Sequence, residues 1–343
     1  MTEAIDRTAW MSGRYGVMSH WLIPGVLPES GKPARSLDEA VDAFDLARLL
    51  ADFEASGAEW YLFTLGQNTG KYASPNKVIE ALAGPGHCSR RDLALEIAQG
   101  VHALGKRFIA YLPCEVAANT TLQAGFQWNT QAGSDQAAFQ QSYTGAVAEW
   151  ARRFGPLLDG WWFDGCYTWP VFHSRGMNWP LWYAAARAGN PQAALTFNDG
   201  SFCVGSLQPV RAEHDYLSGE IEMLVDGRVR LGREGLEKTH LPEGRFVPGT
   251  GCQWHGLLPL DCFWMHGGQP PSWVPGNPYT ALPLGAQSGP MEAPLYSDEE
   301  LLRFTRACLG AGAALTFNVG LYERGGMGKD TVAQLARIKA SLG

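Results

Sequence analysis

Short apolar runs alternate along this chain with longer segments in which apolar residues recur every three or four positions. Segment 37–54 is one example of the helical period, and Ser36 before it is a candidate N-cap. This alternation is typical of βα units, which build a parallel sheet. The expected strands cover residues 15–21, 60–64, 108–112, 161–163, 194–198, 214–217, 252–255 and 314–319, and the expected helices cover 37–54, 91–104, 135–154, 181–188, 299–309 and 330–341.

Eight strands with intervening helices predict an α/β fold, a (β/α)8 TIM-type barrel formed as a single domain over residues 1–343. The seventh strand is the least distinct, because 262–265 competes with 252–255 for that place. In such barrels catalysis occurs where the C-terminal ends of the strands meet. The polar residues expected at or just beyond those ends are His20, Gln67, Glu115, Asp164, Asn198, Glu220, His255 and Asn318.

The composition suits a large core and argues against several partners. Of 343 residues, 45% are hydrophobic and 18% charged, and the net charge of −7 with no basic run disfavours nucleic-acid binding. The sequence has no run of about 18 apolar residues to span a membrane, and its polar, acidic start is unlike a signal peptide. We therefore expect a cytoplasmic protein that binds neither nucleic acid nor membrane, in an oligomeric state that the sequence leaves open.

Several kinds of cofactor chemistry lack their motifs. The seven cysteines are scattered and never in C-x-x-C spacing, which predicts free thiols and no zinc site. There is no Gly-x-Gly-x-x-Gly after a first strand, no phosphate loop, no His-Glu-x-x-His and no Gly-x-Ser-x-Gly. We expect no cofactor and no metal.

The strongest candidate for chemistry is Asp164. It follows three consecutive aromatic residues, Trp161, Trp162 and Phe163, and precedes Gly165. This order predicts a buried strand that delivers a carboxylate to the floor of an aromatic pocket, as in sites where sugar rings stack on indoles beside a catalytic acid. The structural alternative is a core strand whose Asp caps the next helix.

A glycosidase needs a second carboxylate, and the densest acidic group near a predicted strand end is 213–222. Within it, Glu220 stands just beyond the expected strand, where it would reach the mouth of the barrel. Glu213, Glu222 and, after the third strand, Glu115 are rivals for the same role. The structural alternative is a solvated acidic loop.

Sugar sites also combine hydrogen-bonding side chains with aromatic platforms. For His20 a buried structural role is an equal alternative, and Trp264 is a further platform candidate. The residues expected to contact a sugar are His20, Trp21, Gln67, Asn68, Glu115, Trp162, Asn198, Trp254 and His255.

These motifs, in this order, resemble the α-L-fucosidases of glycoside hydrolase family 29. The resemblance implies that His20 contacts the sugar, that Asp164 of Trp-Phe-Asp-Gly is the nucleophile, and that Glu220 is the acid/base of some members. It rests on segments 16–21, 162–165, 196–199, 215–220 and 310–320.

Two departures from the family bear on the substrate. The second strand of the family ends in Lys-His-His-Asp-Gly-Phe, whose histidines hold fucose hydroxyls, whereas Gln67 and Asn68 stand at the equivalent place here. A pocket with different donors should prefer a different sugar. In addition, only one helix is expected after the last strand, so the C-terminal β-sandwich usual in the family is not expected in this sequence.

The sequence thus predicts a retaining exo-glycosidase, in which Asp164 attacks the anomeric carbon and Glu220 protonates the leaving oxygen. The substrate would be a small or oligomeric glycoside, fucoside-like or related. The alternatives are a non-catalytic carbohydrate-binding or sensing barrel, and a transglycosidase that passes the sugar to a second sugar.

Overall fold

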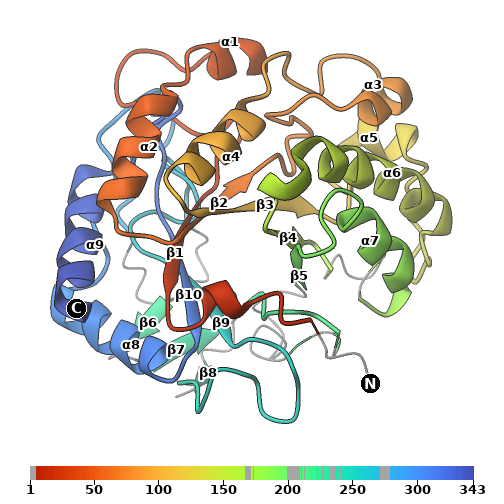
Figure 1. Ribbon diagram of the computed structural model, residues 1–343. Coiled ribbons are helices and arrows are strands. Elements are labelled where there is room, and N and C mark those ends of the chain that lie inside the picture. Colours follow the sequence, from red (N-terminus) through yellow and green to blue (C-terminus); the bar gives the residue numbers. More distant parts are fainter. Residues whose placement is uncertain are drawn as a thin grey trace.

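A computed structural model describes residues 5–166, 171–172, 174–198, 209, 211, 213–221, 223–225, 228–231, 236–238, 241–270 and 279–343. Its main sheet has seven strands in the order β5-β4-β3-β2-β1-β10-β9, and every neighbouring pair is parallel. The sheet curls into a half-barrel with the helices around its outside (Figure 1). The strands are β1 Tyr15–Ser19, β2 Trp60–Thr64, β3 Arg107–Pro113, β4 Gly160–Asp164, β5 Ala194–Phe197, β9 His255–Pro259 and β10 Ala314–Asn318.

Most of the described α-helices begin at a side-chain cap that the sequence supplies, whereas those over Ala137–Phe154 and Lys329–Leu342 do not. Ser36 accepts a hydrogen bond from the Glu39 backbone N–H, as expected. The expected helix over 37–54 is wrong in one respect: it is two helices, because Asp45 caps a second one by accepting from Arg48 N. The helices are α1 Leu37–Asp42, α2 Leu46–Ala55, α3 Lys77–Ala83, α4 Leu93–Ala103, α5 Thr120–Gly125, α6 Ala137–Phe154, α7 Trp179–Ala186, α8 Asp298–Gly310 and α9 Lys329–Leu342.

Successive strand residues enter two different parts of the core, because side chains alternate across a strand. Tyr61 and Phe63 pack between the sheet and the helices. Trp60 and Leu62 point into the half-barrel, where the Trp60 Nε1–H donates to Thr316 Oγ1 at 2.9 Å. Buried side chains of this second part of the core therefore occupy the inside of the curl below the C-terminal ends of the described strands.

The expected sixth strand, 214–217, is not a strand of the sheet. Segment 214–221 lies between β5 and β9: Asp215 N–H donates to Leu195 O, and isolated bridges pair Tyr216 with Gln253 and Glu220 with Leu257. Gly219 interrupts it with a φ of +67°, and a Cβ there would collide with the backbone carbonyl of His255. The described residues therefore form an α/β half-barrel; they do not form the closed eight-stranded barrel.

Two further expectations need correction. The seventh strand is β9, three residues beyond the expected 252–255, because the apolar run from Gly256 to Leu260 enters the sheet. The alternative 262–265 is a series of bends. A small antiparallel sheet of β6 Met223–Val225, β7 Arg228–Leu231 and β8 Leu236–Lys238 was not expected at all.

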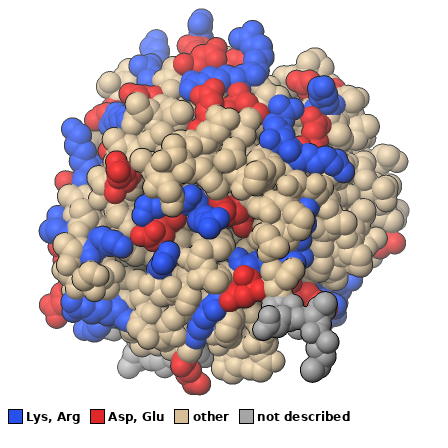
Figure 2. Space-filling model, in the orientation of Figure 1, with Lys and Arg blue, Asp and Glu red and all other residues tan. Residues whose placement is uncertain are grey.

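The described surface is mixed in charge. Lys and Arg intermingle with Asp and Glu over the face seen in Figure 2. Among the described residues, no helix combines the length and the apolar character that crossing a membrane requires. The six described cysteines are buried and form no disulfide.

Candidate active site

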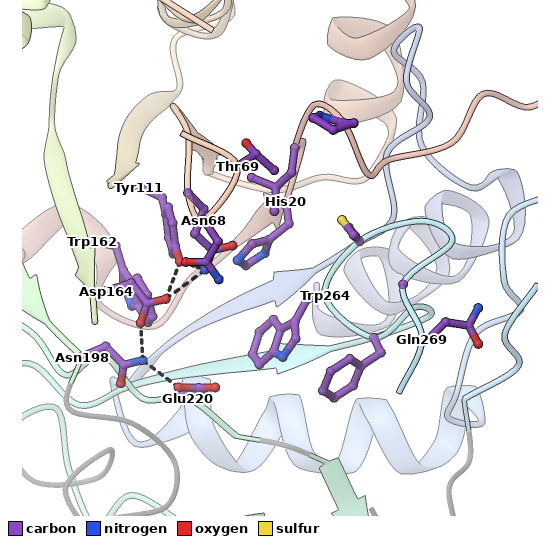
Figure 3. Close-up of a pocket in the computed structure, with 16 residues that line it drawn as sticks. His20, Asn68, Thr69, Tyr111, Trp162, Asp164, Asn198, Glu220, Trp264 and Gln269 are labelled. Carbon is purple, nitrogen blue, oxygen red and sulfur yellow. Dashed lines mark hydrogen bonds between the residues drawn. The ribbon is translucent and has the colours of Figure 1, made fainter. Parts of the chain in front are cut away.

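A cavity of about 470 Å³ opens at the C-terminal ends of the parallel strands (Figure 3). Such a volume is typical of small-ligand sites. Side chains from the ends of β1 to β5 form one side, and the segments after β1 and β9 form the other. The lining residues are His20, Leu22, Pro24, Gln67, Asn68, Thr69, Tyr111, Trp162, Asp164, Asn198, Glu220, Phe263, Trp264, Met265, Gly268 and Gln269.

Asp164 ends β4 and is 6% exposed, at the base of this pocket. Its Oδ2 accepts hydrogen bonds from the Tyr111 hydroxyl and, at 3.2 Å, from Gln67 Nε2. Its Oδ1 accepts from Asn198 Nδ2 at 3.0 Å. These three donors fix the position of both carboxylate oxygens, as an attacking nucleophile requires.

Asn198 follows β5, the strand paired with β4, and joins the two candidate carboxylates. Its Nδ2 donates to Asp164 Oδ1 at 3.0 Å and to Glu220 Oε2 at 2.6 Å. Both dashed contacts are seen in Figure 3, where the amide lies between the carboxylates. The structure thus brings together three residues that the sequence placed at separate strand ends.

Tyr111 is the main pocket residue that sequence reasoning missed. It lies in β3 opposite Trp162, and the two rings stack with centroids 5.3 Å apart. Trp162 is fixed in turn by its Nε1–H, which donates to Ser218 O at 3.0 Å. The alternation of side chains along β3 could have indicated this residue. Tyr111 points into the half-barrel like Ile109, two residues before it, and it carries a hydroxyl close to the C-terminal end of the strand.

His20 reaches the pocket just after β1, and its tautomer follows from its neighbours. Asn318 Nδ2 donates to Trp264 O at 2.9 Å, so Asn318 Oδ1 can only accept, and the His20 Nδ1 3.1 Å away from it must carry the proton. Burial lowers the pKa of His20 below its ordinary value, although Asn318 and Asp164 act to raise it. A neutral ring protonated on Nδ1 presents Nε2 as an acceptor for a ligand hydroxyl.

Glu115 lies behind the pocket, beside a small cavity that it lines with Gln67 and Asn68. Its Oε2 accepts from the Ala117 backbone N–H, and burial, with a smaller contribution from the charge of Asp164, raises its pKa to about 7. The residue therefore stands near the nucleophile, but it is not among the residues that line the main pocket.

Three residues expected to contact a sugar lie in the core, outside the pocket lining. Trp21 follows His20 on extended backbone and so points the opposite way, between Phe44 and Phe63. Trp254 and His255 stand at the start of β9, the end of the strand away from the pocket. His255 is bonded through both ring nitrogens, to Leu217 O at 2.9 Å and Thr316 Oγ1 at 2.7 Å, and burial lowers its pKa to about 4.

The rivals of Glu220 separate clearly in space. Glu213 is exposed at the surface, where it pairs with Arg211 at 3.1 Å. Glu222 lies outside the described residues.

Trp264, the further platform candidate, lines the pocket beside His20, with ring centroids 5.4 Å apart. Within the described part of the chain, no group of three or more His, Cys, Asp or Glu side chains is arranged to hold a metal ion.

Comparisons with known proteins give a likeness in fold. No protein-family model matches the sequence, and no curated protein matches it. The endo-fucoidan hydrolase P5AFcnA from glycoside hydrolase family 107 is 15% identical with a TM-score of 0.65, over 98% of this chain and 93% of that one.

A second member of family 107, the endo-fucoidan hydrolase MfFcnA4, is 16% identical with a TM-score of 0.64. The match covers 98% of this chain but only 53% of that one. The α-L-fucosidase isoenzyme 1 from Paenibacillus thiaminolyticus is 15% identical with a TM-score of 0.61, over 98% of this chain and 75% of that one. The resemblance to fucosidase-like glycoside hydrolases is therefore confirmed at the level of the fold.

Proposed function

We propose that this protein is a retaining exo-glycosidase acting on an α-L-fucoside-like or related glycoside, with Asp164 as nucleophile and Glu220 as acid/base. One observation carries the proposal: the two carboxylates meet in one pocket and share the amide of Asn198. The fold likeness to glycoside hydrolases supports the same reaction class.

The spacing of the carboxylates supports retention. Because Asn198 Nδ2 is 3.0 Å from one carboxylate oxygen and 2.6 Å from the other, these two oxygens are no more than about 6 Å apart. Retaining enzymes hold their carboxyl groups about 5–5.5 Å apart, whereas inverting enzymes need about 6.5–9.5 Å to admit a water.

The hydrogen bonds indicate which oxygen of Asp164 attacks the sugar. Oδ2 is held by two donors and Oδ1 by one, so Oδ1 keeps more charge density for attack on the anomeric carbon. In the first step Oδ1 bonds to that carbon while the aglycone oxygen takes the proton of Glu220 and leaves. In the second step Glu220 takes a proton from water, whose oxygen displaces Asp164 and releases the sugar.

The identity of the sugar rests on the polar side of the pocket. Gln67 and Asn68 replace the histidines of the fucosidases, and Gln67 is already committed to Tyr111 and Asp164. His20 Nε2 and the Asn68 amide then serve the substrate hydroxyls. These hydrogen-bonding groups differ from those of the fucosidases, which supports a glycone related to fucose but not identical to it.

The test is turnover of a panel of aryl glycosides, fucosides included, by the wild-type protein and the Asp164→Ala variant. Wild type should release phenol from at least one member, and the variant should be slower by several orders of magnitude, with azide restoring part of the rate as an external nucleophile. Binding of a sugar without turnover would instead support a sensing barrel. Release of disaccharide products in the presence of an acceptor sugar would support a transglycosidase.

A further inference from the structure

The pocket has a second side that the reaction above does not use. Leu22 and Pro24 contribute to it from the segment after β1, and Phe263, Trp264 and Met265 from the segment after β9; together these five residues are called the apolar wall. Figure 3 shows Trp264 to one side of Asp164 and Glu220, with Gln269 beyond it.

The two segments of the apolar wall pack on each other. Met265 covers Gly25, where an added Cβ would lie 3.2 Å from the Met265 Cε. Trp264 has a φ of +65°, which is uncommon for a non-glycine residue and is held by the hydrogen bond from Asn318 Nδ2 to its carbonyl at 2.9 Å. A residue whose backbone is held in such an uncommon conformation at the edge of a pocket is a candidate for contact with a ligand.

A buried hydrogen bond anchors the same segment from behind. His266 Nδ1 lies 2.7 Å from Glu292 Oε2, with the two side chains 0% and 2% exposed. The other oxygen of Glu292 accepts from the Gly267 N–H at 2.9 Å. The apolar wall is therefore fixed before any ligand arrives, which lowers the cost of ordering it on binding.

The apolar wall lies on the side of the proposed proton donor. Phe263 packs against Met223, three residues after Glu220, and against Tyr279, with ring centroids 5.3 Å apart. A general acid must reach the oxygen that departs. Glu220 and this wall line the same cavity, so a group that takes a proton from Glu220 can lie against the wall.

The charge of the pocket is of one sign. Among the described lining residues the charged side chains are Asp164 and Glu220, and no Lys or Arg is present. An anionic group on the substrate would enter beside two carboxylates with no cation among the described lining residues to offset them.

We propose that the apolar wall is a leaving-group subsite that selects uncharged glycosides of an apolar alcohol or phenol. This inference rests on the proposed glycosidase function. The C1–O bond breaks, the aglycone oxygen takes the Glu220 proton, and the alcohol leaves along the apolar wall.

The test compares the methyl, butyl and 3-carboxypropyl glycosides of the sugar that the aryl panel identifies. Butyl adds three methylenes to methyl, each worth about fourfold when buried, so its kcat/KM should exceed that of the methyl glycoside by about 60-fold. The 3-carboxypropyl glycoside, equal in length to butyl but anionic, should fall to the methyl value or below. Equal kcat/KM for the three would overturn the inference while leaving the glycosidase intact.

Met265→Lys should abolish the preference for butyl and raise kcat/KM for the 3-carboxypropyl glycoside. Leu284→Lys is the matched control, because Leu284 is 92% exposed and outside the pocket lining. If wild type turns over no glycoside, the proposed function fails. Binding to the apolar wall is then measured separately, by the fluorescence of the neutral probe N-phenyl-1-naphthylamine. Binding by wild type and by Leu284→Lys but not by Met265→Lys supports the wall, and equal binding by all three overturns it.

Discussion

Replacing Asn198 by Ala tests the central contact of the site, because a single amide nitrogen serves both carboxylates. During the first step Asp164 loses charge to the anomeric carbon while Glu220 gains charge by giving up its proton. The bond to Asp164 therefore weakens as the bond to Glu220 strengthens, and the two changes oppose each other. Because they oppose each other, the net loss should not exceed that of one charge-assisted hydrogen bond, roughly 1.5–3 kcal/mol, so kcat/KM should fall by at most about 10- to 150-fold.

The same substitution should move the pH–rate profile. A donor to a carboxylate favours its ionised form, so removing the donor favours the protonated form. The basic limb, which reports loss of the proton from the general acid, should therefore move to higher pH. The assay is kcat/KM for the best aryl glycoside between pH 4 and pH 9.

The fold should survive this change, because the backbone bonds of residue 198 remain: its N–H donates to Phe163 O at 2.7 Å and its carbonyl accepts from Cys166 N–H at 3.0 Å. Asn190→Ala is the matched control. Asn190 precedes the same strand at its other end and donates to Leu158 O at 2.9 Å. A wild-type rate and an unmoved basic limb in Asn198→Ala would refute the idea that this amide couples the carboxylates.

Three further predictions follow from the same geometry. Glu220→Ala should cripple hydrolysis of a glycoside with an alkoxide leaving group, cost much less for an activated aryl glycoside, and remove the basic limb; equal losses on both substrates would move the proton donor to Glu115. Simple α-L-fucosides should be poor substrates because Gln67 and Asn68 replace two histidines, and efficient hydrolysis of an unactivated fucoside would show that the replacement is neutral. Glu115 has a pKa of about 7 in the folded protein, against 4.5 for an unperturbed glutamate. Between these two values the folded protein binds more protons than the unfolded chain, so the free energy of unfolding should fall by up to about 3 kcal/mol as the pH rises through them. Glu115→Gln should flatten that fall in denaturant titrations at pH 5 and pH 8, and an unchanged pH dependence would contradict the assignment.

The sequence was a good guide wherever the chemistry follows a well-formed strand. Asp164 ends β4 and Asn198 directly follows β5, and because these strands are paired, the rule for parallel strand ends places the two side chains together. Gln67 and His20 follow β2 and β1 in the same way. In each case a mostly apolar run ends near a polar residue, so the pattern predicts both the strand and the place where it ends.

The rest of the site depends on contacts that no local pattern encodes. The strand β9 begins where the aromatic and polar cluster at 252–255 ends, so Trp254 and His255 belong to the opposite end of the sheet. Three residues of the apolar wall come from 263–265, whose position depends on Glu292, Gly25 and Asn318 far away along the chain. Tyr111 lies within an expected strand, and its role depends on the hydrogen bond from its hydroxyl to Asp164, 53 residues further along the chain.

Glu220 and Asp164 are held in different ways, and the difference fits their roles. Asp164 ends a strand with neighbours on both sides, β3 and β5, and three donors surround its carboxylate. Glu220 lies on the interrupted segment, where Leu257 N–H donates to Gly219 O and Ile221 N–H to Leu257 O, each at 2.8 Å. A nucleophile must meet one carbon at one distance, which a rigid strand provides. An acid/base must serve first the aglycone oxygen and then a water, and a segment tied to the sheet by single bridges can adjust between those two positions while the Asn198 amide keeps it in reach of the nucleophile.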